Sequence, residues 1–295
     1  MAVIIFSRAT VKALFLCSLS ALGSFASPSL QADSLSAQRA LYQQAKEQLN
    51  SKQMAQFSAT KARLKNYPLY PYLEQRELEQ SFATISQSHI DRYAKRYAAL
   101  PSTYLLQRHW LNFLAKEQRW NDYLLAASTA DINTEEHACY ARKARLNTGK
   151  ITAALDNIAT FWNVGHSISD ICDPVFDAWI SKQGGPSSDL AQQRFWKAVA
   201  KNNIGLASYL QRFITEKEHQ QPVEQFFKVR ANPALLETRG LLKGKTVATQ
   251  ETYLYGLASL SRKDPQLATR IWLNIRANYA FSAEQRQALN RRLAG

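Results

Sequence analysis

Short amphipathic segments dominate this sequence, and almost no stretch alternates polar and apolar residues as a strand would. Helices are predicted at residues 37–49, 54–64, 87–98, 102–118, 120–128, 134–147, 187–201, 204–214, 249–261, 265–277 and 282–293. One compact bundle would need longer helices to bury a shared core, whereas short helices can be buried in antiparallel pairs that stack on one another. The expected fold class is therefore all-α, an α-solenoid of short antiparallel helix pairs with a curved, concave face.

Three stretches modify this pattern. Residues 67–74 form a proline-broken aromatic elbow ahead of a helix that ends near residue 80. Residues 151–162 place five apolar side chains on one face of a single expected helix, and Gly149 before it is suited to a left-handed helix end. Residues 215–245 contain two prolines and two glycines and are expected to be a looser turn region.

The first 32 residues have the layout of a secretory signal. Arg8 and Lys12 precede an apolar run at 13–22, and small and polar residues follow up to Ala32, where cleavage is expected; Ala26 is an earlier alternative. The apolar run is too short to cross a bilayer, so no stable membrane span is expected. The expected domains are a signal peptide at 1–32 and an α-superhelical domain at 33–295, with its completeness at the C-terminus left open.

Two cysteines, Cys139 and Cys172, remain after the signal is removed. In an exported chain a disulfide is the default for such a pair, and closing this loop would stabilise the fold by roughly 3 to 4 kcal/mol. Two free buried thiols are the alternative. A zinc site that adds His137 lacks the paired ligand spacing of known zinc sites.

The chain is strongly basic. Removal of residues 1–32 takes away Arg8 and Lys12 and no acidic residue, so the formal net charge falls from +14 to +12. Such a charge favours an anionic partner, and outside the cytoplasm a cell-wall polymer or an anionic lipid surface is a better candidate than nucleic acid. The alternative is that Lys and Arg simply solvate the outer faces of the helices.

Residue patterns that would indicate catalysis are missing from the sequence. The five histidines form neither an H-x-x-x-H nor an H-E-x-x-H pattern, and each is expected at the surface or at a helix cap. Gly244-Lys245-Thr246 is similar to the end of a phosphate-binding loop, but Arg239 stands where that loop needs its first glycine. The six tryptophans are expected to fill space between helices rather than to stack on sugars. The residues themselves predict binding or scaffolding, with no catalytic residue, no metal site and no cofactor.

Several motifs, taken together, resemble one family. They are Tyr67–Glu74, Cys139–Ala141 with Asn147–Gly149, Phe161-Trp162 with Gly165, Cys172–Trp179, and the turn Arg262–Pro265. In this order they are similar to the N-terminal superhelical domain of the large soluble lytic murein transglycosylases. The resemblance covers most of residues 33–295, is most specific between the two cysteines and is weak at 215–245.

The resemblance implies a right-handed, ring- or arc-shaped α-superhelix with one disulfide, in a periplasmic enzyme that acts on peptidoglycan. The family cleaves the β-1,4 bond from N-acetylmuramic acid to N-acetylglucosamine without water and leaves a 1,6-anhydro product. Its catalytic glutamate lies in a lysozyme-like C-terminal domain, in a Glu-Ser dipeptide followed by Gly-Leu-Met-Gln. This sequence contains no Glu-Ser dipeptide, and its methionines are Met1 and Met54. The chain is therefore expected to be inactive on its own and to bind or guide glycan strands.

Candidate contacts to the glycan are the basic residues on predicted helices within the matching blocks: Arg76, Arg108, Arg142, Lys143 and Arg145. The alternative for each is a solvated surface position. A second hypothesis for the whole chain is an exported helical-repeat scaffold that docks a partner protein of the cell-wall machinery. That scaffold would expose apolar residues on its concave face, where the first hypothesis expects Lys and Arg.

Overall fold

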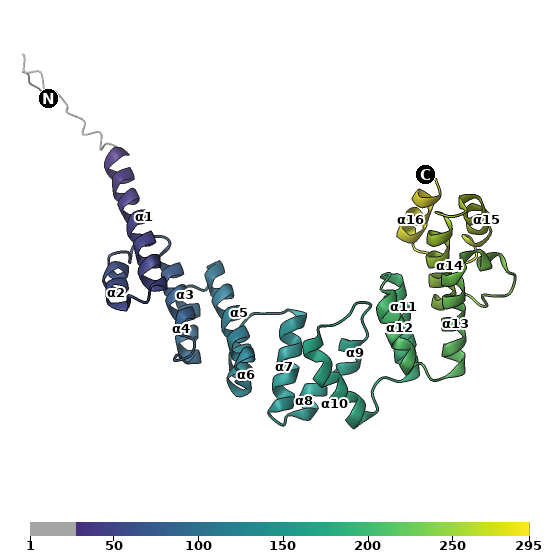
Figure 1. Ribbon diagram of the computed structural model, residues 1–295, viewed down its shortest axis with the longest axis horizontal. Coiled ribbons are helices and arrows are strands. Elements are labelled where there is room, and N and C mark those ends of the chain that lie inside the picture. Colours follow the sequence, from purple (N-terminus) through teal and green to yellow (C-terminus); the bar gives the residue numbers. More distant parts are fainter. Residues whose placement is uncertain (1–27, 295) are drawn as a thin grey trace, which may run out of the picture. The chain divides into compact units, whose positions relative to one another are not determined.

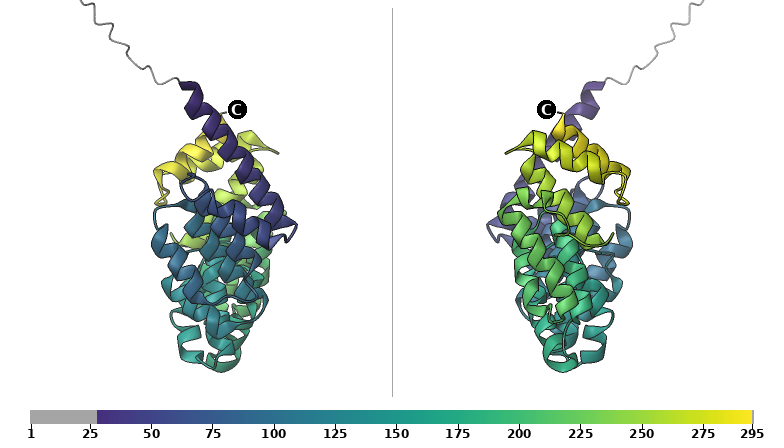
Figure 2. Two further views of the ribbon diagram at one scale, coloured as in Figure 1. Left: turned by 90° about the vertical axis from the view of Figure 1, so that its left-hand side faces the viewer. Right: turned by 90° about the vertical axis from the view of Figure 1, so that its right-hand side faces the viewer.

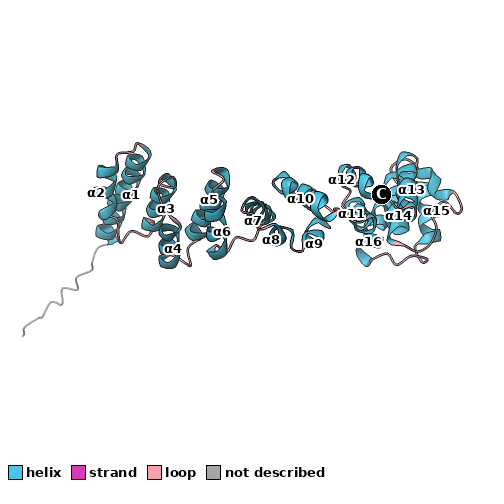
Figure 3. Ribbon diagram, turned by 90° about the horizontal axis from the view of Figure 1, so that it is seen from below, coloured by secondary structure: helices cyan, strands magenta, loops and turns pink. Residues whose placement is uncertain are grey.

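The computed structural model describes residues 28–294, and within that range it contains helices, turns and loops but no strand (Figure 3). The helices are α1 (Pro28–Asn50), α2 (Met54–Ala62), α3 (Tyr70–Gln80), α4 (Gln87–Arg96), α5 (Pro101–Lys116), α6 (Trp120–Thr129), α7 (Glu135–Asn147), α8 (Ile151–Leu155), α9 (Ile158–Trp162), α10 (Asp173–Gln183), α11 (Ser188–Ala200), α12 (Ile204–Leu210), α13 (Lys217–Ala231), α14 (Val247–Leu260), α15 (Pro265–Ile275) and α16 (Ala283–Leu293). Short 3₁₀ helices are η1 (Asp170–Cys172), η2 (Gln211–Phe213) and η3 (Pro233–Glu237). No described helix combines the length and the apolar run needed to cross a membrane.

The chain divides into two compact units, residues 1–77 and residues 78–295. In the first unit α1 packs against α2 (Figure 1). Its core joins side chains of α1, α2 and the start of α3, among them Leu49, Phe57 and Leu73. This unit has its own small apolar core.

The second unit is a series of helices that pack mainly against their neighbours in the chain. It has three local cores, centred on Trp110 for α4–α7, on Trp196 for α8–α13, and on Trp272 for α13–α16. In the right-hand view of Figure 2, the green and yellow helices α13–α16 lie in front of the teal helices of the same unit. Serial packing with local cores is the arrangement of a helical solenoid, so the expected all-α class of short stacked helices is confirmed. The ring- or arc-shaped course stays a prediction.

Side-chain caps explain where many helices begin. Thr134, Ser187, Thr246, Asp264 and Ser282 each accept a hydrogen bond from a backbone N–H in the first turn of the helix that follows. Such caps satisfy N–H groups that have no partner inside the helix. The boundaries predicted from the sequence are therefore mostly right within a few residues.

Three predictions about helix boundaries were wrong. Helix α1 begins at Pro28 rather than at residue 37. The single helix expected at 151–162 is broken into α8 and α9, because Asn157 has a left-handed backbone with φ of 50°. Residues 217–231 form the long helix α13 despite Pro222, since Val223, Phe226 and Val229 bury one of its faces. Most of the expected signal peptide, residues 1–27, lies outside the described residues.

A disulfide joins Cys139 of α7 to Cys172 at the end of η1, with the Cα atoms 4.9 Å apart. Both cysteines are fully buried. The expected disulfide is confirmed, and the alternatives of free thiols or a zinc site are excluded. Gly149 has φ of 76°, the left-handed helix end expected after α7.

The loop that leads to the disulfide is held by a buried arginine. Arg194 of α11 is 3% exposed; its Nε donates to the carbonyl of Val164 at 3.1 Å and its NH2 to that of His166 at 3.2 Å. Its guanidinium lies 4.3 Å from the centre of the Trp162 ring, and burial lowers its pKa to about 10. At Gly165 an added Cβ would lie 2.5 Å from the carbonyl oxygen of Lys197, so only glycine fits there.

Candidate binding site between helices α5, α6 and α7

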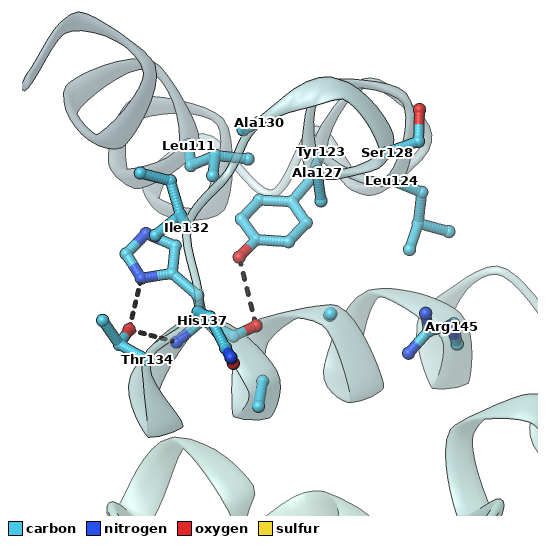
Figure 4. Close-up of a pocket in the computed structure, with 13 residues that line it drawn as sticks. Leu111, Tyr123, Leu124, Ala127, Ser128, Ala130, Ile132, Thr134, His137 and Arg145 are labelled. Carbon is cyan, nitrogen blue, oxygen red and sulfur yellow. Dashed lines mark hydrogen bonds between the residues drawn. The ribbon is translucent and has the colours of Figure 1, made fainter. Parts of the chain in front are cut away.

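A hollow of about 220 Å³ opens between α5, α6 and α7 in the second unit (Figure 4). Its wall combines apolar side chains with a few polar ones. The lining residues are Leu111, Tyr123, Leu124, Ala127, Ser128, Ala130, Ile132, Asn133, Thr134, His137, Ala138, Ala141 and Arg145.

The local sequence explains how the hollow forms. Helix α6 ends at Thr129, and a non-helical link at 130–134 carries the chain across to the cap of α7. The buried Tyr123 of α6 donates its hydroxyl to the backbone carbonyl of His137 at 3.3 Å, which ties α6 to the first turn of α7. Burial raises the pKa of Tyr123, so this hydroxyl stays protonated and can act as the donor.

His137 supplies the hollow with an unpaired polar atom. The side chain is 6% exposed, its Nδ1 shares a hydrogen bond of 2.8 Å with the Thr134 hydroxyl, and its backbone N–H donates to the same oxygen (Figure 4). Its Nε2 has no hydrogen-bond partner within residues 28–294. A buried polar atom left unpaired costs about 1–3 kcal/mol.

The charge state of His137 follows from its surroundings. Burial is the largest effect and lowers the pKa of the imidazole; the Glu136 carboxylate acts in the opposite direction, and the Arg108 guanidinium lowers the pKa further. The ring is therefore neutral at neutral pH. A neutral imidazole can accept or donate one hydrogen bond at Nε2, according to its tautomer.

A positive charge stands at the other end of the hollow. Arg145 lies two turns beyond His137 on α7, which corresponds to about 12 Å along the helix axis. It also lines a shallower hollow of about 470 Å³ with Arg142, Thr152, Ala153 and Asp156. Arg145 forms no ion pair with any acidic group in the described part of the chain. Its charge is available to an anionic ligand.

The structure separates the five basic residues singled out in the sequence. Arg145 lines the hollow, and Arg108 of α5 lies close enough to His137 to affect its pKa. Lys143 instead lies 5.9 Å from the centre of the Trp120 ring, in a cation–π contact. Arg76 is an exposed residue of the first unit.

Arg142 has an internal role. Its NH1 donates to the carbonyl of Ala154 at 2.8 Å and to that of Asp156 at 2.7 Å, and its guanidinium lies 4.8 Å from the Phe161 ring centre. Burial, and secondarily the charge of Arg145, lower its pKa. Arg142 therefore stabilises the break between α8 and α9, where the carbonyls have left the helical pattern.

The histidines behave mostly as the sequence suggested, with His137 as the exception. His89 caps α4, and His166 pairs with Glu135 at 2.6 Å on the surface. His137 also caps its helix, but it is buried and faces the hollow, which the sequence did not reveal. Its burial depends on α5 and α6 packing over the start of α7, and no local pattern encodes that contact.

One group of side chains has the spacing of a metal site: the exposed Glu216 and Glu218 with the partly buried His219. However, the Nδ1 of His219 already shares a hydrogen bond of 3.0 Å with the Ser188 hydroxyl. The Ser188 oxygen also accepts the N–H groups of Thr215 and Glu216. We therefore interpret the group as part of the contact that fixes the start of α13 against α11.

The tryptophans fill the cores, as expected. Trp110, Trp162, Trp179, Trp196 and Trp272 are all buried. None of them lines the hollow between α5, α6 and α7. The hollow therefore offers aliphatic contacts, one imidazole and one guanidinium rather than an aromatic sugar platform.

Comparison with protein families gives one match to a family model, the cucumovirus coat protein, at residues 114–240. This match covers less than half of the chain. None of the relatives and solved structures described below is a coat protein. The match therefore assigns no family to the chain.

Curated relatives give a consistent picture. The chain is 29% identical over 239 residues to the soluble lytic murein transglycosylase of Escherichia coli K12, which is 81% of this chain and 36% of that protein. It is 28% identical over 260 residues to the enzyme of the same name from Salmonella typhimurium, which is 88% of this chain and 40% of that protein. The chain spans well under half the length of the relatives it matches.

Solved structures agree with these relatives. A complex of the 70-kDa soluble lytic transglycosylase with bulgecin A matches with a TM-score of 0.67 and 26% identity, over 88% of this chain and 42% of that one. An inactive variant of a lytic transglycosylase from Pseudomonas aeruginosa matches with a TM-score of 0.61 and 27% identity, over 86% of this chain and 41% of that one. The similarity extends over both units of the chain.

Proposed function

Because this chain is homologous to the soluble lytic murein transglycosylases over most of its own length, we propose that it is a periplasmic, peptidoglycan-associated superhelical domain of that kind. Its role in this proposal is to bind and guide the glycan strand. The relatives act on murein, as their names state, and the basic character of this chain suits a polymer that carries carboxylates.

The hollow between α5, α6 and α7 is the observation that carries the proposal. Peptidoglycan offers N-acetyl groups on its sugars and carboxylates on its peptide stems. An N-acetyl methyl would pack on Leu124 and Ile132, and its amide would pair with the Nε2 of His137 after a small rotation of the ring uncovers this buried atom. A carboxylate would then meet Arg145, while Arg108 adds positive charge from α5.

Bond cleavage is assigned elsewhere in this proposal. The family reaction cleaves the β-1,4 bond and forms the 1,6-anhydro sugar with a glutamate in a lysozyme-like domain. The described residues would hold the strand and supply no catalytic glutamate. Release of anhydro-muropeptides from sacculi by the purified chain would contradict this part of the proposal.

Export is part of the same proposal. The signal peptide expected at residues 1–32 would direct the chain to the periplasm, with Asp33 as the first residue of the mature protein. N-terminal sequencing of protein recovered from the periplasm tests this. A retained Met1 would contradict it.

A sacculus co-sedimentation assay tests glycan binding. Wild-type protein is expected to sediment with purified sacculi at low salt and to be released at about 0.5 M salt, where charge interactions are screened. Arg145→Gln is expected to weaken sedimentation several-fold. Arg230→Gln, which removes the same charge from an exposed position on α13, is the matched control.

Three outcomes would contradict glycan binding: no sedimentation at low salt, salt-independent sedimentation, or equal losses for Arg145→Gln and Arg230→Gln. Retention that depends on a co-purifying protein would instead favour the scaffold hypothesis. That hypothesis would use exposed apolar residues, and those among the described residues include Leu125, Val247 and Leu273, each on a different helix.

A further inference from the structure

A second hollow, of about 410 Å³, lies in the same unit between α11, α14 and α16. Its charged lining residues are Glu251 of α14, Arg262 just after α14, and Arg292 in the last turn of α16. Leu254, Tyr255 and Leu289 provide apolar surface. None of these residues lines the hollow between α5, α6 and α7.

Glu251 is a half-buried carboxylate without a cationic partner. Its one contact within the described residues is a weak hydrogen bond of 3.4 Å, which the Nε2 of Gln285 donates to its Oε1. Burial alone raises its pKa, and no positive charge offsets this effect. An ionised Glu251 is therefore a negative group that a cation in the hollow would stabilise.

A local sequence motif holds the Gln285 side chain in place for its hydrogen bond to Glu251. Ser282 and Gln285 form a capping box at the start of α16, in which the Oε1 of Gln285 accepts the N–H of Ser282 at 2.9 Å. The Nε2 of the same amide is thus directed to Glu251. A capping residue of α16 and an acid of α14 are thus joined by a hydrogen bond in the wall of the hollow.

Two arginines, Arg262 and Arg292, line the same hollow and form no ion pair with the acid. Both are exposed, and neither forms an ion pair in the part of the chain that the structure describes. Neither guanidinium influences the Glu251 carboxyl, since burial is the sole cause of its raised pKa. The hollow is therefore lined by one half-buried negative group, two exposed positive groups and apolar side chains.

We propose that this hollow binds the zwitterionic end groups of a short peptide, with the peptide ammonium on Glu251 and its carboxylate on Arg262 and Arg292. A dianion would leave Glu251 unpaired and repelled, and a simple cation would leave both arginines without a partner. A short zwitterion satisfies all three groups, while its side chains contact Leu254 and Leu289. This site is independent of the glycan-binding function proposed above.

Calorimetric titration of the full chain with trialanine tests the proposal. Trialanine is expected to bind, and acetylation of its amine or amidation of its carboxylate is expected to weaken binding about tenfold each. Glu251→Gln should abolish the preference for the free amine, and Arg292→Gln should abolish the preference for the free carboxylate.

Arg291→Gln is the matched control, because Arg291 neighbours Arg292 on α16 but does not line the hollow. Circular dichroism of each variant checks its fold. Absence of trialanine binding, equal affinity for the three peptides, or equal effects of Arg291→Gln and Arg292→Gln would each overturn the proposal. Trialanine should still bind to the Arg145→Gln variant, because Arg145 does not line this hollow. Failure of the glycan assay and failure of the peptide assay can therefore be told apart.

Discussion

The second unit has two hollows between packed helices, and they differ in their titratable groups: one is lined by a histidine and the other by a glutamate. The hollow between α5, α6 and α7, here called the α7 hollow, is lined by a neutral, buried imidazole and lies beside α7, the helix that carries Cys139 of the disulfide. The hollow between α11, α14 and α16, here called the α14 hollow, is lined by a half-buried carboxylate and two exposed arginines, and noncovalent packing alone holds its helices. Because each junction has its own core, a serial helix stack can hold different ligands at different points.

Loss of the disulfide should have the largest effect on this comparison. Cys139→Ala with Cys172→Ala removes the cross-link between α7 and η1 and is expected to lower the free energy of unfolding by roughly 3 to 4 kcal/mol. Urea unfolding measures the change. Trialanine binding at the α14 hollow should persist under conditions where the variant is folded. A change in the free energy of unfolding below about 1 kcal/mol would contradict the stabilising role of the disulfide. Loss of trialanine binding by the folded variant would contradict the independence of the two hollows.

Crowding the loop next to the disulfide should have the next largest effect. Gly165→Ala would place a Cβ 2.5 Å from the Lys197 carbonyl oxygen, and the forced shift should cost about 1–3 kcal/mol. Thermal unfolding measures it. Gly205→Ala is the control, since its nearest neighbour would lie 3.9 Å away and alanine favours the helix α12. The account fails if Gly165→Ala is no less stable than the control.

Glu251 should make stability decline as pH rises. Its pKa is raised from 4.5 by burial, so the folded state holds the proton to a higher pH than the unfolded state does. The ionised form then destabilises the fold above that range. Glu251→Gln should flatten this decline in a series of urea midpoints measured upward from about pH 4.5. An unchanged slope would show that the carboxyl is not desolvated as described.

His137 should have the opposite and smallest effect. Its pKa is lowered from 6.5 mainly by burial, so the unfolded state binds the proton more readily. The stability contributed by the neutral ring is fully present above the unfolded-state pKa of 6.5 and is lost as the pH falls below that value. His137→Gln should remove this acid-side loss, whereas His89→Gln, at the exposed cap of α4, should retain it. Equal slopes for the two variants would contradict the buried position of His137.

Local sequence patterns were sufficient to predict most of the helices, and the two cysteines left after the expected signal peptide were sufficient to predict the disulfide. Helical spacing of apolar residues located most elements, and the Asp264-Pro265 start of α15 follows from capping rules alone. The break at Asn157 was missed because Arg142 stabilises it from a different helix. Helix α13 was missed because its buried face outweighs Pro222, an effect of packing rather than of propensity.

The candidate site was predicted only in part, for the same reason. Of the five basic residues, Arg145 lines the α7 hollow and Arg108 lies near enough to lower the pKa of His137, while Arg142 turns inward. The polar atoms that give the hollows their chemistry, on His137 and Glu251, owe their properties to burial by helices distant in sequence. Residue type and spacing do not reveal such burial.

The most direct test of glycan holding is the imidazole signal of His137. In nitrogen-labelled protein, addition of a soluble disaccharide-peptide from murein should shift the Nε2 resonance of His137, because the free ring nitrogen gains a hydrogen bond. The His89 resonances should stay in place, and Arg145→Gln should weaken the response. A His137 resonance that stays unchanged while the protein still sediments with sacculi would contradict the proposed site.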